Sequence, residues 1–202
     1  MSSLPNLLTI ARIAIIPLFV AAFYFSGEES RWLAFSLFCL AAITDAFDGL
    51  IARRWQAESL LGRMLDPIAD KLIVAAALLM LAWDHSLDGL NLIPALVILC
   101  REILVSGLRE FLAQAAVSLP VTSLAKFKTV MQMIAIAALI AAKPGEQMFQ
   151  GVTRVALIIL WIAAALTLYT GYAYFRAGII HATAPQKRPA ARTRVQRQQN
   201  AV

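Results

Sequence analysis

Four aspartates within 26 positions are the residues of this sequence best suited to chemistry: Asp45, Asp48, Asp66 and Asp70. Residues three or four positions apart lie on one face of a helix, so each pair presents two carboxylates on the same side. Carboxylate oxygens are the ligands that hard divalent cations prefer. Four carboxylates suit two ions, which can stabilise both oxygens of an in-line phosphoryl displacement. The spacing therefore predicts a divalent metal site.

Simpler explanations exist for acids of this kind. Protonation removes part of the charge, and Arg53 and Lys71 could pair with two of the four carboxylates. A buried acid can be a plain salt-bridge partner, and an acid at the end of a helix can be merely solvated. For a single aspartate these explanations are as good as metal binding. For four in this arrangement, metal binding is the more economical interpretation.

The composition indicates that membrane helices must position these acids. Of the 202 residues, 60% are hydrophobic and 15% are charged, and the mean hydropathy is +0.73. A soluble chain of this length needs more polar surface, so the bilayer is the expected solvent. The net charge of +6 does not indicate nucleic acid, because six of the 18 basic residues fall in the last 27 positions without any acid. We expect a membrane domain over residues 1–176 and a basic, disordered cytoplasmic tail over 177–202.

The predicted fold class is an all-α membrane protein with six transmembrane helices. Apolar runs long enough to cross a bilayer lie at 7–25, 32–54, 67–83, 91–112, 124–142 and 152–175. Basic residues gather in the connections after the second and fourth runs, which places both termini in the cytoplasm. Asp45 precedes Arg54 by nine residues, about 13 Å along a helix. The acids should therefore line an inner-leaflet cavity that faces the cytoplasm.

A second group of charges lies near the cytoplasmic ends of the fourth and fifth runs. Its members are Arg101, Arg109, Lys126 and Lys128. A substrate phosphate needs a basic pocket of this kind beside the reaction centre. The alternative is membrane topology alone, since the positive-inside bias also places Lys and Arg there.

The acid-bearing segment resembles the signature of the CDP-alcohol phosphatidyltransferases, D-x2-D-G-x2-A-R-x8-G-x3-D-x3-D. All eight fixed positions are matched at the stated spacing, from Asp45 to Asp70. The resemblance extends to about residue 176. Other segments resemble the bacterial phosphatidylglycerophosphate synthase branch of this family: Leu4 to Thr9 with Arg12, Arg101-Glu102, Arg109-Glu110 and Lys126 to Thr129.

The resemblance implies the transfer of a phosphatidyl group from CDP-diacylglycerol to an alcohol, with release of CMP. By analogy, Asp45 and Asp66 bridge two Mg²⁺ ions (or Mn²⁺), Asp48 and Asp70 complete the sites, and Asp70 is also the catalytic base. Matched positions also imply a group of residues that bind the CDP portion: Gly49, Arg53, Ser59, Thr9 and Arg12. The family also implies a multi-pass protein of the bacterial inner membrane, usually a homodimer.

The branch implies sn-glycerol 3-phosphate as the acceptor alcohol, bound by Arg109, Lys126, Lys128 and Arg101. Ala125 stands where the branch usually has glycine before its first lysine, so inositol phosphate, glycerol or serine stay open as acceptors. A cation or proton transporter is an alternative from another class, because intramembrane acids also mark ion pathways. Such a transporter would more naturally place its acids near the midplane of repeated halves, and this sequence has no internal repeat.

Overall fold

The computed structural model describes residues 4–55, 60–114 and 123–183, and over these residues it is helical with no strand. The elements in chain order are α1 (Leu4–Tyr24), α2 (Glu28–Trp55), α3 (Leu60–Trp83), the 3-10 turn η1 (Gly89–Asn91), α4 (Leu92–Gln114), α5 (Ser123–Ile140), α6 (Ala142–Met148) and α7 (Val152–Thr183). The prediction of an all-α protein is confirmed.

The six long helices coincide with the six predicted apolar runs. Three of the described helices are long and apolar enough to cross a bilayer: Gly89–Ala113, Ser123–Ile140 and Val152–Ile180. The apolar helix Ile10–Tyr24 is shorter, and the number of spans stays a prediction. Two boundaries differ from the sequence pattern: α7 continues past residue 176, and α6 forms where Lys143 to Glu146 indicated a loop. Pro144 lies in the first turn of α6, where proline is tolerated because that N–H needs no helical partner.

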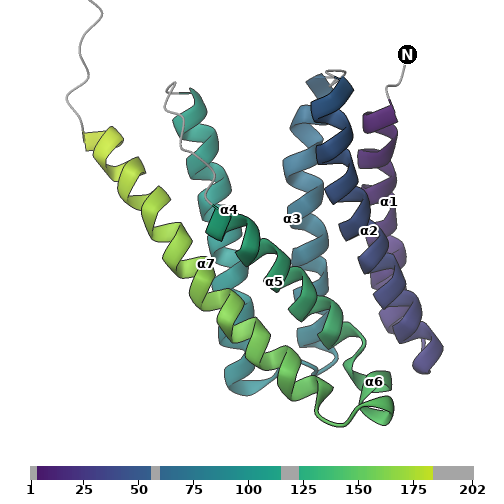
Figure 1. The fold of residues 1–202 in the computed structure, drawn as a ribbon. Coiled ribbons are helices and arrows are strands. Elements are labelled where there is room, and N and C mark those ends of the chain that lie inside the picture. The colour runs from purple at the N-terminus through teal and green to yellow at the C-terminus, as the bar shows by residue number, and fades with distance from the viewer. Residues whose placement is uncertain (1–3, 56–59, 115–122, 184–202) are drawn as a thin grey trace, which may run out of the picture.

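The helices form two groups. In the first, α1 packs on α2 and α3; in the second, α7 packs on α5 and α4, and fewer contacts join α3 to α4 and α5. Figure 1 shows α1, α2 and α3 side by side, with α7 running diagonally across α4. The start of α1 and the described end of α7 lie at the same end of the bundle as the end of α2 and the start of α3 (Figure 1).

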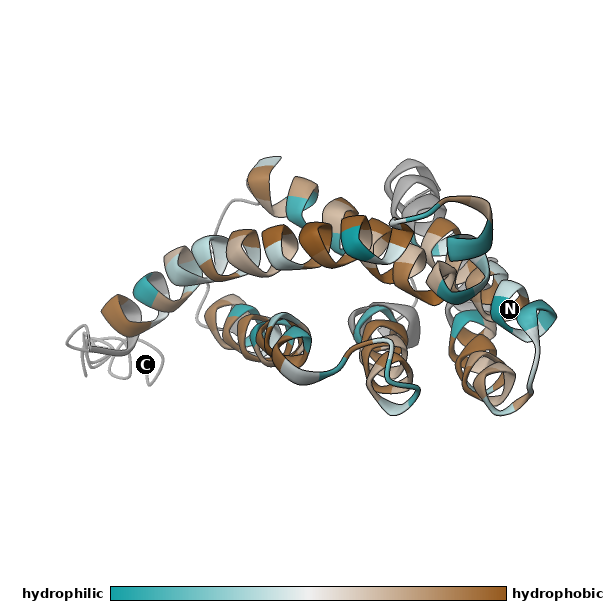
Figure 2. Cartoon of the chain, turned by 90° about the horizontal axis from the view of Figure 1, so that it is seen from below, coloured by the Kyte–Doolittle hydropathy of each residue, from teal (hydrophilic) through white to brown (hydrophobic). Residues whose placement is uncertain are grey.

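The interior is apolar and closely packed, and so is much of the surface. Phe19, Phe38, Leu81, Ile136 and Leu160 are among the fully buried side chains of a core that draws on both groups. Large apolar side chains are also exposed on all six long helices, for example Leu79, Leu96 and Ile158. Figure 2 shows this apolar colour continuing around the helices. Exposed apolar surface on this scale is typical of a protein whose solvent is lipid.

A buried carboxylate ties the helices together at the opposite end of the bundle, after α3. Asp84 accepts hydrogen bonds from the backbone N–H and the hydroxyl of Ser86, at 3.0 and 3.1 Å. It also pairs with Arg31 of α2 and, at 3.1 Å, with Lys143 of α6. The Arg31 guanidinium lies 4.4 Å from the ring centroid of Phe23 in α1. One carboxylate therefore joins the ends of α2, α3 and α6.

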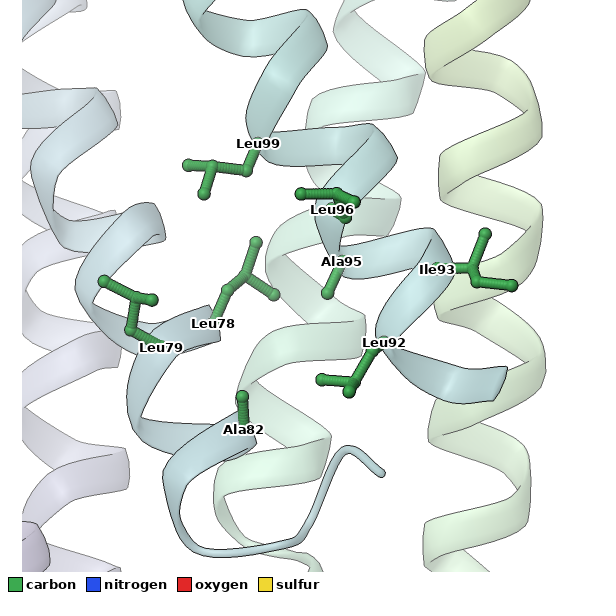
Figure 3. Close-up of a pocket in the computed structure, with 8 residues that line it drawn as sticks. All are labelled: Leu78, Leu79, Ala82, Leu92, Ile93, Ala95, Leu96 and Leu99. Atoms are coloured by element: carbon green, nitrogen blue, oxygen red, sulfur yellow. The ribbon is translucent and has the colours of Figure 1, made fainter. Parts of the chain in front are cut away.

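An apolar groove of about 260 Å³ lies between the second half of α3 and the first half of α4. Figure 3 shows its eight lining residues: Leu78, Leu79, Ala82, Leu92, Ile93, Ala95, Leu96 and Leu99. None of these side chains carries a polar group, so the groove offers only apolar side-chain contacts.

Candidate active site

Asp45 and Arg12 form an ion pair between α2 and α1. The distance from Arg12 Nη1 to Asp45 Oδ1 is 2.9 Å. Arg12 is buried within the bundle, whereas the Asp45 side chain is 41% exposed. A buried cation needs a partner, and Asp45 provides one while part of its surface remains accessible. Arg12, expected on the CDP side from the family resemblance, thus lies against an acid of the predicted metal site.

Asp70 on α3 lies within electrostatic range of Asp45 on α2, and Arg12 interacts with it in the same way. Its side chain is 42% exposed, and Oδ2 lies 3.9 Å from the ammonium nitrogen of Lys71. The structure thus brings together two of the four predicted acids, on neighbouring helices and partly open. We refer to Asp45 and Asp70 as the acid pair.

The other residues expected around the acid pair lie where no side chain is described. Thr9, Asp48, Gly49, Arg53 and Asp66 belong to helices, but their side chains are outside the described set, and Ser59 lies outside the described residues altogether. Among the described side chains no three acids, histidines or cysteines gather around one point. Asp48 and Asp66 are not among these described side chains.

A charged pocket of about 270 Å³ opens next to Asp70, between Lys71 on α3 and the middle and second half of α4. It is lined by Lys71, Arg101, Glu102, Val105, Ser106, Arg109, Glu110 and Ala113. Three of these residues are cationic and two are acidic. The same helix pair that forms the apolar groove at one end therefore forms a charged pocket at the other.

The predicted basic residues differ in their relation to this pocket. Arg101 and Arg109 line it, and Lys128 is buried beside it, where its ammonium donates to Glu102 Oε1. Lys126 is exposed on α5 and is not among the lining residues found in the described part of the chain. Residues two positions apart on a helix do not share a face, so Lys126 and Lys128 cannot both turn toward the pocket.

Glu102 was assigned no role from the sequence, yet it lines the charged pocket. It accepts hydrogen bonds from Arg101 of its own helix, at 3.2 Å, and from Lys128 of α5. It also interacts electrostatically with Asp70. The signal that could have found it is its place within an apolar run, because an acid within an apolar helix is costly and calls for a partner.

The donor set of the acid pair fits a hard divalent cation. Both groups are carboxylates, they lie close enough to repel each other, and both are partly exposed. Arg12 and Lys71 offset part of this repulsion, and the remaining exposed oxygens are of the type that Mg²⁺ prefers.

Comparison with known proteins agrees with the chemistry of this site. Residues 2–169 match the CDP-alcohol phosphatidyltransferase family. A Rickettsia bellii protein named CDP-diacylglycerol–glycerol-3-phosphate 3-phosphatidyltransferase is 51% identical over 87% of this chain and 94% of its own length. Proteins of the same name from Cereibacter sphaeroides and Pectobacterium atrosepticum are each 40% identical, over 86% and 87% of this chain and 94% of their own lengths. The chain belongs to the CDP-alcohol phosphatidyltransferase family.

Proposed function

We propose that this membrane enzyme transfers a phosphatidyl group from CDP-diacylglycerol to sn-glycerol 3-phosphate, giving phosphatidylglycerophosphate and CMP. Relatives at 40–51% identity carry the name of this activity. The structural observation that carries the proposal is the position of the charged pocket next to Asp70, since Lys71 and Glu102 both line it. Such a pocket can hold an anionic acceptor next to carboxylates that act on its hydroxyl.

The acceptor would bind through its phosphate in the charged pocket. Lys71, Arg101 and Arg109 supply three cationic side chains, and arginine forms paired hydrogen bonds to phosphate oxygens. Glu110 and Ser106 add groups that accept hydrogen bonds from hydroxyls. The combination suits a small molecule that carries both a phosphate and free hydroxyls.

Asp70 would act as the general base. It adjoins Lys71, which lines the charged pocket, so it lies between the acceptor and the remaining acids. As the acceptor hydroxyl oxygen forms its bond to the β-phosphorus of CDP-diacylglycerol, its proton passes to Asp70. The bond from that phosphorus to the oxygen of CMP breaks, and CMP leaves with the electron pair.

Asp45, Asp48, Asp66 and Asp70 would hold two Mg²⁺ ions, with Mn²⁺ as a substitute. Bound there, the ions would neutralise the charge that develops on the phosphate oxygens. Arg12 orients Asp45 through their 2.9 Å contact and offsets part of its charge. Thr9, Gly49, Arg53 and Ser59 are proposed to bind the CDP portion, on the strength of the signature alone.

We place all six long helices across a bacterial inner membrane, with both termini in the cytoplasm and the charged pocket open toward it. The common end shared by the start of α1, the end of α2, the start of α3 and the described end of α7 supports this orientation (Figure 1). Single cysteines placed at positions 3 and 200, and labelled in intact and in permeabilised cells, test this orientation. Reaction of either position in intact cells contradicts it. A homodimer, usual in the family, is tested by light scattering in detergent.

The activity is tested with purified protein in detergent, CDP-diacylglycerol and Mg²⁺. Glycerol 3-phosphate, inositol phosphate, glycerol and serine are offered separately, and release of radiolabelled CMP is measured. We expect release with glycerol 3-phosphate alone. Release with another acceptor instead would overturn the assignment of the alcohol. No release from folded protein with any acceptor would overturn the reaction itself and favour ion transport.

A further inference from the structure

Arg101 is held from two sides, and one of them is a helix that does not line the charged pocket. Its Nη1 donates to Glu102 Oε1 at 3.2 Å, and its Nη2 donates to the hydroxyl of Thr170 on α7 at 3.0 Å. Thr170 Oγ1 in turn lies 2.8 Å from the carbonyl oxygen of Leu166. Its single proton is donated to the backbone, so a lone pair is directed at the guanidinium.

The surface of α7 is hollow next to this hydrogen bond. Gly171 is buried, and a Cβ atom added there would lie 3.2 Å from both Cγ and Nε of Arg101. That distance is tighter than ordinary packing, so a side chain at position 171 would displace the arginine by a few tenths of an ångström. The stem of Arg101 therefore lies across a gap that only glycine leaves open.

Glu102 completes the arrangement by separating two cations of different helices. Its Oε1 accepts from both Arg101 on α4 and Lys128 on α5, and all three side chains are largely buried. Without this acid the guanidinium and the ammonium group would repel each other in surroundings of low dielectric constant. Their common anion fixes both.

We propose that Thr170, Gly171 and Glu102 are positioning residues, which hold Arg101 so that the charged pocket binds the acceptor phosphate. The inference rests on the proposed function and extends it from the residues that line the pocket to α7. Thr170 and Gly171 are not among the pocket residues and need not touch the acceptor. Their effect on acceptor affinity would be transmitted through the orientation of one guanidinium.

The central test compares two threonines one turn apart on α7. Thr170→Val removes the hydroxyl that Arg101 uses, whereas Thr167→Val removes an equally buried hydroxyl without a hydrogen-bond partner among the described residues. We expect Thr170→Val to raise the KM for glycerol 3-phosphate by about tenfold, the value of one hydrogen bond to a charged group. The KM for CDP-diacylglycerol and kcat should stay near wild type, and Thr167→Val should change neither KM.

Two further variants separate positioning from general loss of structure. Thr170→Ser keeps the hydroxyl and should restore the wild-type KM. Gly171→Ala should raise the acceptor KM, while Gly107→Ala, with open space around the new methyl group, should not. The inference is overturned if Thr170→Val and Gly171→Ala leave the acceptor KM unchanged, or if they raise both KM values alike.

Measurements on Arg109→Gln and on the wild type distinguish a failure of this inference from a failure of the proposed function. If Arg109→Gln raises the acceptor KM while Thr170→Val does not, the charged pocket binds the acceptor but Thr170 does not position Arg101. If the wild type does not use glycerol 3-phosphate, inorganic phosphate binding is followed by the shift in melting temperature. Weaker phosphate binding in Thr170→Val than in Thr167→Val supports the inference independently of turnover, and equal binding overturns it.

Discussion

The two ends of this bundle use the same residue type in opposite ways. At one end, the Asp84 side chain is 7% exposed, and Ser86, Arg31 and Lys143 surround it with donors. Toward the other end, the side chains of Asp45 and Asp70 are 41% and 42% exposed. A carboxylate saturated by its own protein contributes to stability. A carboxylate kept partly open where burial would be expected is available to a ligand.

Removal of divalent metal should have the largest effect on activity, and it should act at the acid pair and not at Asp84. We expect a chelator to abolish transfer, because the acid pair without cations cannot neutralise the phosphates. The melting temperature should change little, since Asp84 and its partners need no metal. CMP release before and after Mg²⁺ is restored measures the first effect, and thermal unfolding measures the second. Undiminished transfer in the chelator would remove the metal from the proposal.

Asp70→Asn should lower kcat by about a hundredfold to ten-thousandfold, the usual contribution of a general base. The protein should still fold, because the Asp70 side chain is partly exposed and its ion pair with Lys71 is long. Initial rates at saturating substrates, with a melting curve as control, measure the change. Full activity in this variant would refute the assignment of the base.

Asp84→Asn should lower stability and leave activity unchanged, the opposite of what we expect for Asp70→Asn. Removing the anion leaves Arg31 and Lys143 uncompensated, and breaking a buried ion pair costs about 3 kcal/mol of the free energy of unfolding. Both KM values and kcat should remain near wild type at temperatures where the protein is folded. A variant that melts normally but transfers slowly would contradict the division between the two ends.

The smallest effect is expected at Glu146, before α7. Its carboxylate accepts from the N–H groups of Gly151 and Thr153, at 2.7 and 3.1 Å, and these bonds lower the pKa of Glu146 below its usual 4.5. A lowered pKa in the folded state stabilises the protein above the ordinary pKa, and this stability is lost as the pH falls through the folded value. Glu146→Gln should therefore melt slightly lower than wild type at about pH 7, and the difference should disappear as the pH falls through the lowered pKa of Glu146. A gap that is independent of pH would contradict this account.

Local sequence patterns predicted the six long helices, because apolar runs of about 20 residues separated by charges and glycines leave the backbone few alternatives in a bilayer. Such patterns were less informative at turns. Gly27 and Gly151 have φ angles of 122° and 92°, which favour glycine, and they precede α2 and α7. The short helix α6 escaped prediction because its Lys-Pro-Gly sequence is equally typical of a loop.

The acid pair was predictable because spacing along two consecutive helices determines which faces the carboxylates share. The hydrogen bond that holds Arg101 on Thr170 was not predictable, because it joins residues 69 positions apart. Thr170 and Gly171 look unremarkable in an apolar helix, and no local pattern tells which helix packs on α7. The role of Lys126 in binding the acceptor stays a prediction from the family branch, since it does not line the pocket found in the described part of the chain.

The grouping of the helices also bears on how such enzymes diversify. Both members of the acid pair come from α2 and α3, whereas Arg101, Arg109, Lys128 and their supports come from α4, α5 and α7. Most of the side chains proposed to bind the alcohol therefore lie in the second half of the polypeptide, although Lys71 on α3 also lines the charged pocket. Substitutions in the second half can recruit a new alcohol while the first half continues to perform an unchanged reaction.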